Sequence, residues 1–270
     1  RLPPISSLFP FTSLFRSTAS SKVVILEDGN RVVTSKVVQL GTGSTGPQKV
    51  LEEALAESGL KMEDMAKVVA TGYGRFSFEQ ADRQVSEISC HAKGVYHLIP
   101  TARTIIDIGG QDAKAIKLDE KGGVSQFFMN DKCAAGTGRF IDVMARVLEV
   151  TITEMQDYDA KATEAAPISS TCTVFAESEV ISQLSQGTSK ENIIAGVHQS
   201  VAVKACGLAF RGGITPDVVM SGGVAQNAGV VRAISRELKQ PVIVAPNSQV
   251  AGALGAALYA YEDALKAMKK

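Results

Sequence analysis

Two cysteines stand where a thiol can become reactive or bind metal. Cys133 and Cys172 each precede a segment with apolar residues at helical spacing, in NDKCAAGTGRFIDVMARVL and SSTCTVFAESEVISQL. A helix N-terminus carries about half a positive charge, which favours the thiolate form of a nearby cysteine. Iron-sulfur clusters normally take four thiolates. Two per chain are half of that set, and a twofold dimer axis would supply the other half.

The competing interpretation of the cysteines is packing. Intracellular cysteines are often small buried hydrophobes, and neither Cys133 nor Cys172 belongs to a CxxC pair. Cys90 and Cys206 lie far from both in the sequence. Four scattered cysteines in 270 residues are typical of a reducing compartment, which predicts a cytoplasmic protein.

Charge and hydropathy argue against two classes of partner. The chain has 28 basic and 28 acidic residues and is 45% hydrophobic, so no net charge attracts nucleic acid or an anionic membrane. No apolar run approaches the roughly 20 residues of a membrane span. The composition therefore predicts one large globular domain or two joined halves, with no nucleic-acid and no membrane partner.

Three glycine clusters lie where a chain can approach phosphate. In DIGGQD, Asp107 to Asp112, the glycines let backbone N–H groups reach phosphate oxygens, and the carboxylates can hold Mg2+ or orient a water. AAGTGR, residues 134–139, lies at a helix N-terminus, which binds anions. MSGGVAQN, residues 220–227, closes a strand and opens a helix. One such cluster is typical of a structural turn; three on one framework indicate a nucleotide site.

The elements that must position these motifs form two similar halves. In the first, Asp28-Gly29 joins two β-branched runs within residues 22–40 into a hairpin. A helix over 47–59 and a buried strand over 67–71 follow. The second half has strands at 104–108, 113–118 and 124–129, and its hairpin superposes on the first at an offset of 92 residues (114 minus 22). This weak duplication predicts two α/β lobes with a ligand between them.

Beyond the cysteine helices, strands and helices alternate, which favours mostly parallel sheets. The predicted elements are a helix over 193–210, a strand over 217–220, a helix from about 225, a strand over 242–245 and a helix from 252. The expected organisation is an atypical stretch at 1–16, a first lobe at 17–100 and a second lobe at 101–270 that carries the cysteine helices and the adenosine motif.

The order of DIGGQD, NDKCAAGTGRF, ISSTCTVFAESEVISQL, VVMSGGVAQN and GALGAALYA resembles the ATP-dependent activators of 2-hydroxyacyl-CoA dehydratases, in the wider group with activators of benzoyl-CoA reductase. The resemblance implies an α/β fold of the duplicated actin, sugar kinase and Hsp70 type, with two lobes around a nucleotide cleft. It implies a homodimer of an anaerobe, in which Cys133 and Cys172 of each chain hold one 4Fe-4S cluster. The implied work is ATP-driven transfer of one electron from a ferredoxin or flavodoxin to a dehydratase component.

The resemblance also assigns roles at an ATP/ADP site. Asp107 would lie near Mg2+ or the attacking water, and Gln111 is the second candidate catalytic residue. Glu177, on the second cysteine helix, could orient nucleotide or Mg2+. The full set of candidate nucleotide-binding residues is Ser17, Thr18, Gly109, Gly110, Gly136, Thr137, Gly138, Glu177, Gly222, Gly223 and Asn227.

The start of the chain departs from the pattern. The family's first phosphate loop reads Asp-x-Gly-Ser-Thr, and only Ser17-Thr18 matches, with Leu14 and Arg16 at the Asp and Gly positions. This predicts impaired ATP hydrolysis, since Leu cannot hold a metal-bound water. The start also lacks acidic residues, as transit peptides do. A misread start, a divergent loop and a subunit that binds nucleotide poorly are the three explanations.

Two alternatives remain. A small-molecule kinase of the same fold would need the glycine motifs but no cluster, and a nucleotide-sensing subunit would bind without hydrolysis. Iron content and an ATPase assay separate them. His91, His97 and His198 lack metal-ligand spacing and are interpreted as surface or core histidines.

Overall fold

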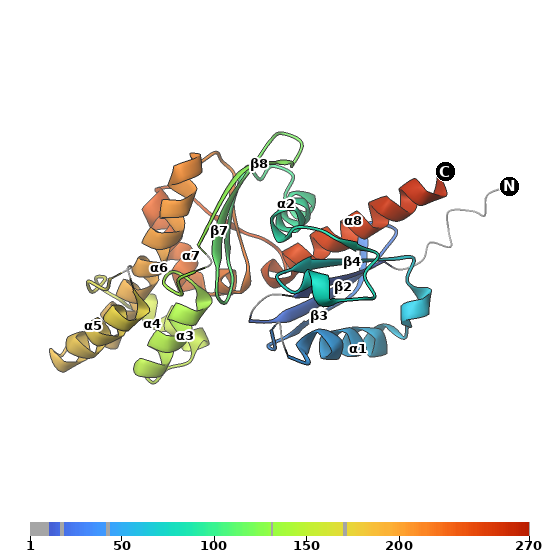
Figure 1. The fold of residues 1–270 in the computed structure, drawn as a ribbon. Helices are drawn as coiled ribbons and strands as arrows, with labels where there is room; N and C mark the ends of the chain where they lie inside the picture. The colour runs from blue at the N-terminus through green and yellow to red at the C-terminus, as the bar shows by residue number, and fades with distance from the viewer. Residues whose placement is uncertain (1–10, 17–18, 42–43, 131, 170–171, 270) are drawn as a thin grey trace. The chain divides into compact units, whose positions relative to one another are not determined.

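The chain forms two compact units in a computed structural model. Unit 1 comprises Arg1–Pro100 and Gln249–Lys270, and unit 2 comprises Thr101–Ser248. Each unit contains a five-stranded mixed sheet with helices packed on it (Figure 1). The structure describes residues 19–41, 44–130, 132–169 and 172–269, and the backbone of residues 11–16.

The sheet of unit 1 has the order β3-β2-β1-β4-β5. Its strands are β1 (Phe11–Arg16), β2 (Ser21–Glu27), β3 (Arg31–Val38), β4 (Lys67–Gly72) and β5 (Arg83–Gln84). The strand β2 is antiparallel to β1 and β3, whereas β1, β4 and β5 run parallel. The predicted hairpin is confirmed: Asp28 and Gly29 both have positive φ, as a tight primed turn requires.

The sheet of unit 2 has the corresponding order β8-β7-β6-β9-β10. Its strands are β6 (Thr104–Ile108), β7 (Ala113–Leu118), β8 (Val124–Asn130), β9 (Val218–Ser221) and β10 (Ile243–Val244). The hairpin strands are again antiparallel and the rest parallel. Even the irregularities match: the pairing shifts between Ile25 and Leu26 and between Lys117 and Leu118, again 92 residues apart (117 minus 25). The predicted duplication is therefore confirmed.

Both faces of β2 are covered, by different helices. Val23 and Ile25 pack with α1 (Gly46–Ser58), while Val24 and Leu26 pack with α8 (Ala251–Met268). Successive residues of a strand point to opposite faces, so this apolar run is buried on both sides. The third helix of unit 1, α2 (Glu87–Leu98), packs on α8.

At both ends of the chain, the division into units differs from the expected division into lobes. Residues 1–16 were expected to lie outside the first lobe, yet the backbone of β1 is the central strand of the sheet of unit 1, between β2 and β4. Residues 249–270 were assigned to the second lobe, whereas α8 belongs to unit 1. The physical reason is burial, because the small apolar face of α8 packs on β2 and β4.

The crossing of α2 and α8 depends on two glycines. A Cβ atom at Gly255 would lie 1.8 Å from the carbonyl oxygen of Cys90, and a Cβ atom at Gly94 would lie 1.9 Å from that of Ala251. Because backbone atoms cannot rotate away, an added methyl group must push the two helices apart. We therefore expect Gly255→Ala to lower the free energy of unfolding by about 3 kcal/mol, the upper end of overpacking effects.

A matched control exists in unit 2. Gly207 also lies inside a helix, α6 (Lys190–Gly212), but nothing lies within 4 Å of its Cβ position. Alanine at this position should stabilise the protein by about 0.5–1 kcal/mol, the helix-propensity difference between alanine and glycine. Denaturant unfolding of both variants measures the effects, and similar changes in the two would contradict the close-crossing argument.

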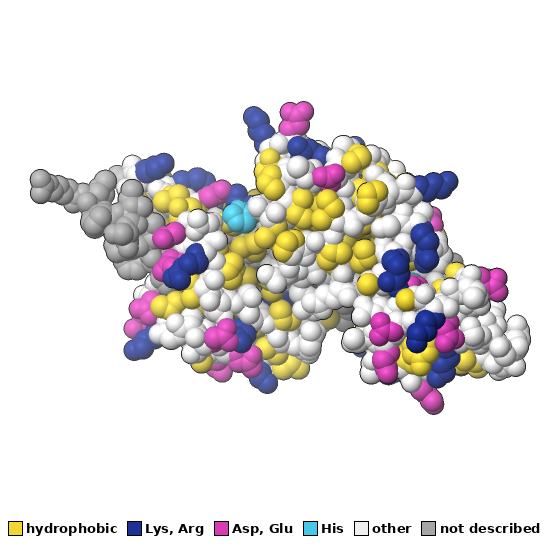
Figure 2. Space-filling model, turned by 180° about the vertical axis from the view of Figure 1, so that it is seen from behind, with side chains coloured by type: hydrophobic (Ala, Val, Ile, Leu, Met, Phe, Trp, Pro, Cys, Tyr) yellow, Lys and Arg dark blue, Asp and Glu magenta, His cyan; other side chains and the backbone are white. Residues whose placement is uncertain are grey.

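The helices of unit 2 surround one large apolar core. They are α3 (Gly138–Val147), α4 (Ile152–Asp159), α5 (Thr173–Ser185), α6 and α7 (Ala228–Leu238). By length and composition α6 could cross a membrane, but 72% of its most apolar stretch is buried inside the structure, as in a core helix. On the face shown in Figure 2, Lys and Arg side chains are interspersed with Asp and Glu.

Candidate functional site

Asp107 lies near the end of β6 and is hydrogen-bonded to both neighbouring strands. Its side chain is 2% exposed. One carboxylate oxygen accepts a hydrogen bond from Ser221 Oγ on β9 at 2.8 Å, and the other accepts from Lys114 Nζ on β7 at 3.2 Å. Both donors are the residues directly opposite Asp107 in the strand pairing. The sheet register therefore fixes the orientation of this carboxylate.

Lys114 lies between two carboxylates. Its Nζ atom is 3.2 Å from Asp107 Oδ2 and 2.8 Å from Asp112 Oδ2, and its side chain is 2% exposed. A buried ammonium group is tolerated only when it is paired. Two carboxylates and one ammonium group carry one formal net negative charge, which suits a bound cation. Sequence reasoning missed Lys114, although a lysine between the apolar residues Ala113, Ala115 and Ile116 of a buried strand was the available signal.

The first two glycine motifs are joined by hydrogen bonds. The N–H groups of Gly138 and Arg139, which begin α3, donate to the carbonyls of Gly109 and Gly110 at 2.8 and 2.7 Å. These two N–H groups therefore hold the DIGGQD turn. Gly109 and Gly110 are half-buried, and the candidate catalytic residue Gln111 is exposed.

The third glycine motif lies against the same strand end. Gly222 has φ of +86°, and a Cβ atom there would be 2.3 Å from the carbonyl oxygen of Ile108 and 2.9 Å from Asp107 Oδ1. Only glycine can fill this position, where the chain leaves β9 beside Asp107. Gly223 follows and begins a short 3-10 helix, Gly223–Gln226. The structure thus brings all three predicted motifs together in unit 2.

Asn227 has a different place from the one expected for a nucleotide contact. It is buried and caps α7, with Oδ1 accepting from the N–H groups of Gly229 and Val230 at 2.9 and 3.3 Å. Its Nδ2 lies 3.4 Å from the Ile152 carbonyl oxygen and 3.4 Å from His198 Nε2. Both ends of the carboxamide are therefore engaged by the protein itself.

Cys133 lies between β8 and α3. Asn130 Nδ2 donates to the carbonyl oxygens of Cys133 and Ala135 at 3.0 and 3.1 Å. Thr137, a candidate nucleotide residue, caps the loop by donating from Oγ1 to the Ala134 carbonyl at 2.6 Å. The thiol is half-buried. It does not immediately precede the helix as expected, because α3 begins at Gly138.

Cys172 is the N-cap residue of α5, as the sequence predicted. Its carbonyl accepts the first helical hydrogen bond, from Ala176 N–H at 3.0 Å, and its thiol is half-buried. Glu179 on α5 binds the backbone at Ser169, where its carboxylate accepts a hydrogen bond from the N–H group at 2.5 Å. Glu177 is half-buried on the same helix. The helices α3 and α5 pack against each other.

The four cysteines fall into two chemical classes. All are thiols; Cys90 and Cys206 are fully buried, and burial raises the pKa of each to about 12. A thiol that does not ionise is a poor metal ligand. Cys133 and Cys172 are partly exposed, the first between β8 and α3 and the second at a helix N-terminus. These two donors fit half of the thiolate set of a 4Fe-4S cluster.

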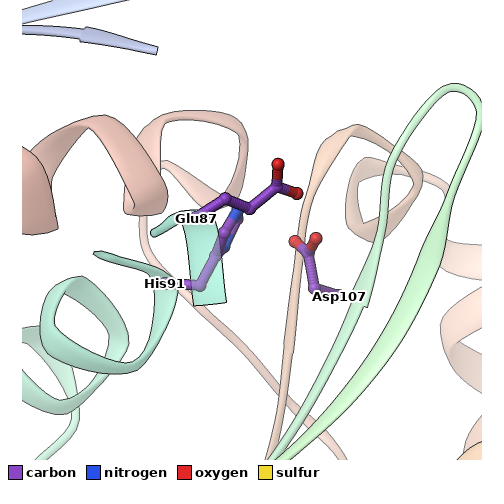
Figure 3. A group of neighbouring side chains, drawn as sticks. All are labelled: Glu87, His91 and Asp107. Carbon is purple, nitrogen blue, oxygen red and sulfur yellow. The ribbon is translucent and has the colours of Figure 1, made fainter. Parts of the chain in front are cut away.

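Ser17 and Thr18 lie outside the described residues. A further pair of polar residues that sequence reasoning did not single out as a pair lies in unit 1, where Glu87 and His91 are buried one turn apart on α2 (Figure 3). His91 and His198 are core histidines, consistent with their interpretation from sequence.

Comparison with known proteins places the chain in a family. The model of the BadF/BadG/BcrA/BcrD ATPase family matches residues 17–260. The activator of lactoyl-CoA dehydratase of Anaerotignum propionicum is 71% identical over 249 residues, which is 92% of this chain and 96% of that protein. These matches confirm the resemblance to activators of 2-hydroxyacyl-CoA dehydratases.

Solved structures agree with the fold. The activator of 2-hydroxyisocaproyl-CoA dehydratase from Clostridium difficile, with bound ADPNP, superposes with a TM-score of 0.93 at 52% identity and covers 96% of this chain and 97% of its own. A ROK family glucokinase from Streptomyces griseus, at 12% identity and a TM-score of 0.57 over 94% of this chain and 99% of its own, shares the fold alone. The duplicated sheets are those of the actin-like ATPase fold. The chain belongs to the BadF/BadG/BcrA/BcrD ATPase family.

Proposed function

We propose that this chain is an ATP-driven activator that delivers one electron at low potential from reduced ferredoxin or flavodoxin to a 2-hydroxyacyl-CoA dehydratase. The observation that carries the proposal is the pair of half-buried thiols, Cys133 and Cys172, in the same unit as the Asp107 site of an ATPase fold. Relatives named as dehydratase activators support it. An oxygen-sensitive carrier also suits the cytoplasm of an anaerobe.

Cys133 and Cys172 would hold a 4Fe-4S cluster together with the same two residues of a second copy. Bound by these thiolates, the cluster supplies a carrier for a single electron. Cys172 lies at the N-terminus of α5, and the Asn130 hydrogen bonds fix the backbone that carries Cys133. Removal of one subunit would leave two ligands, so cluster binding and dimerisation are expected to be coupled.

ATP hydrolysis would supply the driving force. About 59 mV corresponds to 1.4 kcal/mol for a one-electron couple, so raising an electron by about 300 mV requires roughly 7 kcal/mol. Hydrogen bonds and solvent exposure also tune cluster potentials. A demand of this size favours coupling to nucleotide hydrolysis.

Asp107 would orient Mg2+ or the attacking water in this reaction. Lys114 and Ser221 hold its carboxylate. The turn at Gly109 and Gly110 would lie at the phosphate oxygens, with the backbone N–H of Gly110 as the donor, because that of Gly109 donates to the Asp112 carbonyl at 2.9 Å. Gly222 and Gly223 would pass close to the adenosine. Gly136, Thr137 and Gly138 would support this arrangement through the loop that ends on the DIGGQD turn.

The first phosphate loop would contribute less than it does in the family pattern. Ser17 and Thr18 remain candidates for phosphate contacts, whereas Leu14 and Arg16 stand where the pattern has Asp and Gly. The hydrolytic carboxylate is therefore assigned to Asp107 of unit 2. Gln111 and Glu177 are kept as secondary candidates, for the water and the nucleotide respectively.

The proposal predicts ATP-dependent activation of a dehydratase. Protein purified without oxygen, mixed with reduced ferredoxin, ATP and the lactoyl-CoA dehydratase component of Anaerotignum propionicum, should start conversion of lactoyl-CoA to the corresponding 2-enoyl-CoA. Omitting ATP, omitting the reductant or replacing ATP with ADPNP should each lower the rate by at least about 100-fold, since only background electron transfer would remain. Activation that is equally fast without ATP would contradict the proposal.

A further inference from the structure

A hydrogen-bond relay in unit 2 lies outside the residues assigned to ATP hydrolysis and to the cluster. It links His198 on α6, Asp159 at the end of α4, Asn227 at the N-cap of α7 and Arg232 on α7. His198 is 0% exposed and Asp159 is 6% exposed, whereas the Arg232 side chain is 42% exposed. Three helices and the turn that follows Gly222 and Gly223 therefore meet at one polar cluster at the edge of an apolar core. Such a cluster costs free energy unless every member is satisfied.

The directions of the hydrogen bonds follow from Asn227. Its Oδ1 accepts the N–H groups of Gly229 and Val230, so its Nδ2 must face His198 Nε2, 3.4 Å away, and donate to it. His198 Nε2 is then an acceptor, and the ring proton is on Nδ1. From Nδ1 it is donated to Asp159 Oδ1 at 3.1 Å. The relay thus needs a neutral His198 in one tautomer.

Asp159 anchors the other end of the relay. Its second oxygen accepts from Arg232 Nε at 3.1 Å and from a terminal guanidinium nitrogen at 2.6 Å. Burial alone would raise the pKa of Asp159, but the hydrogen bonds from His198 and Arg232 outweigh burial and hold the pKa below its usual value. The carboxylate stays ionised and selects the His198 tautomer that can accept from Asn227.

Asn227 connects this relay to the third glycine motif. Its backbone N–H donates to the Val224 carbonyl at 3.0 Å, closing the short 3-10 helix that begins at Gly223. Rotation of the Asn227 side chain would release the cap of α7, the helix that directly follows this turn. His198 Nε2 and the Ile152 carbonyl therefore hold the side chain of the residue whose backbone closes the turn after Gly222 and Gly223.

We propose that His198 and Asp159 are positioning residues for nucleotide binding, which lock Asn227 so that the Gly222-Gly223 turn keeps the geometry needed on the adenosine side. The inference rests on the proposed function, because it takes these glycines to border the nucleotide. Asn227 links the relay to the turn. It is not assigned a contact with the nucleotide, because both ends of its carboxamide are hydrogen-bonded within the protein. Neither His198 nor Asp159 touches the nucleotide in this account.

The test compares two substitutions that each keep one of the two His198 hydrogen bonds. His198→Gln places an oxygen close to the former Nε2 and can still accept from Asn227, whereas His198→Asn keeps a donor close to the former Nδ1 and can bond only Asp159. The measurement is the Kd for ADP by calorimetry. We expect His198→Asn to raise this Kd about tenfold, the effect of one lost hydrogen bond, and His198→Gln to stay within about threefold of wild type.

The matched control is Gln199→Ala. Gln199 neighbours His198 on α6 and donates to Glu237 on α7 at 2.8 Å, so this change removes a contact between the same helices without touching the relay. It should leave the Kd for ADP unchanged. Unfolding curves of all variants, recorded in parallel, show whether each compared protein is folded.

The outcomes separate the inference from the proposed function. Equal Kd values for His198→Gln and His198→Asn would overturn the positioning role, because a purely structural histidine gives no reason for the two to differ. If wild type itself does not bind ADP, the proposed function fails and the relay's role fails with it. If wild type binds ADP and all variants bind equally well, only the relay inference fails.

Discussion

Asp107→Asn is expected to lower kcat for ATP hydrolysis at least about 100-fold, within the usual range for loss of a group that activates water. The substitution keeps the shape of the side chain but removes the charge from a carboxylate that Lys114 and Ser221 hold in place. Lys114 keeps its ion pair with Asp112, so the variant should fold. A steady-state phosphate-release assay measures the change.

The control for this prediction is Asp157→Asn. It makes the same chemical change at an exposed position on α4 and should leave kcat within twofold of wild type. The Kd for ADP of Asp107→Asn should also change little, because phosphate contacts by the turn are assigned to backbone N–H groups. Hydrolysis by Asp107→Asn at more than a tenth of the wild-type rate would show that Asp107 is not the catalytic carboxylate.

Cys133→Ala and Cys172→Ala should each abolish iron binding. In a cluster shared by two chains, either substitution removes two of the four thiolates at once. Iron and acid-labile sulfide assays on protein purified without oxygen measure the loss, and size-exclusion chromatography should show a weakened dimer. Cys133 and Cys172 are assigned equal roles as cluster ligands, so the two variants should lose iron and dimer stability to the same extent.

Cys206→Ala is the matched control for the cysteine prediction. Its thiol is fully buried and its pKa is raised to about 12 by burial, so it has no part in metal binding. The variant should lose about 1 kcal/mol of stability through the small cavity it leaves and keep its full iron content. Iron retained by Cys133→Ala or by Cys172→Ala would show that the ligands have been assigned to the wrong residues.

Much of the fold could be predicted because its signals are local. The β6, β7 and β8 strands followed from apolar runs bounded by turn residues, and the Asp28-Gly29 hairpin followed from turn chemistry. Two helices, α2 and α4, were missed although each carries a local start signal. Ser86 caps α2, and Thr151 with Glu154 forms a capping box at α4.

The partner of α8 could not be predicted from such signals. An alanine-rich helix packs equally well, by composition, on either sheet. Its place in unit 1 depends on the close crossing with α2 at Gly94 and Gly255, which joins segments about 160 residues apart in the sequence. The chain order alone therefore suggested the neighbouring second lobe.

Residues of the site that have a local sequence pattern could be predicted, whereas residues that only the fold brings together could not. The glycine motifs and Cys172 stand out in the sequence because turn glycines and helix starts have local patterns. Lys114 is one of two lysines in β7, and its role appears only when the sheet register places it opposite Asp107. The His198 relay joins residues from three helices, and no local pattern links them.

The most direct test of the account is the iron and acid-labile sulfide content of wild-type protein purified without oxygen, measured per dimer together with the visible spectrum. The account predicts about four irons and four sulfides per dimer, the content of one shared cubane. A folded, colourless, iron-free protein that binds nucleotide would contradict it, and would favour a kinase or nucleotide-sensing subunit of the same fold whose cysteines only pack.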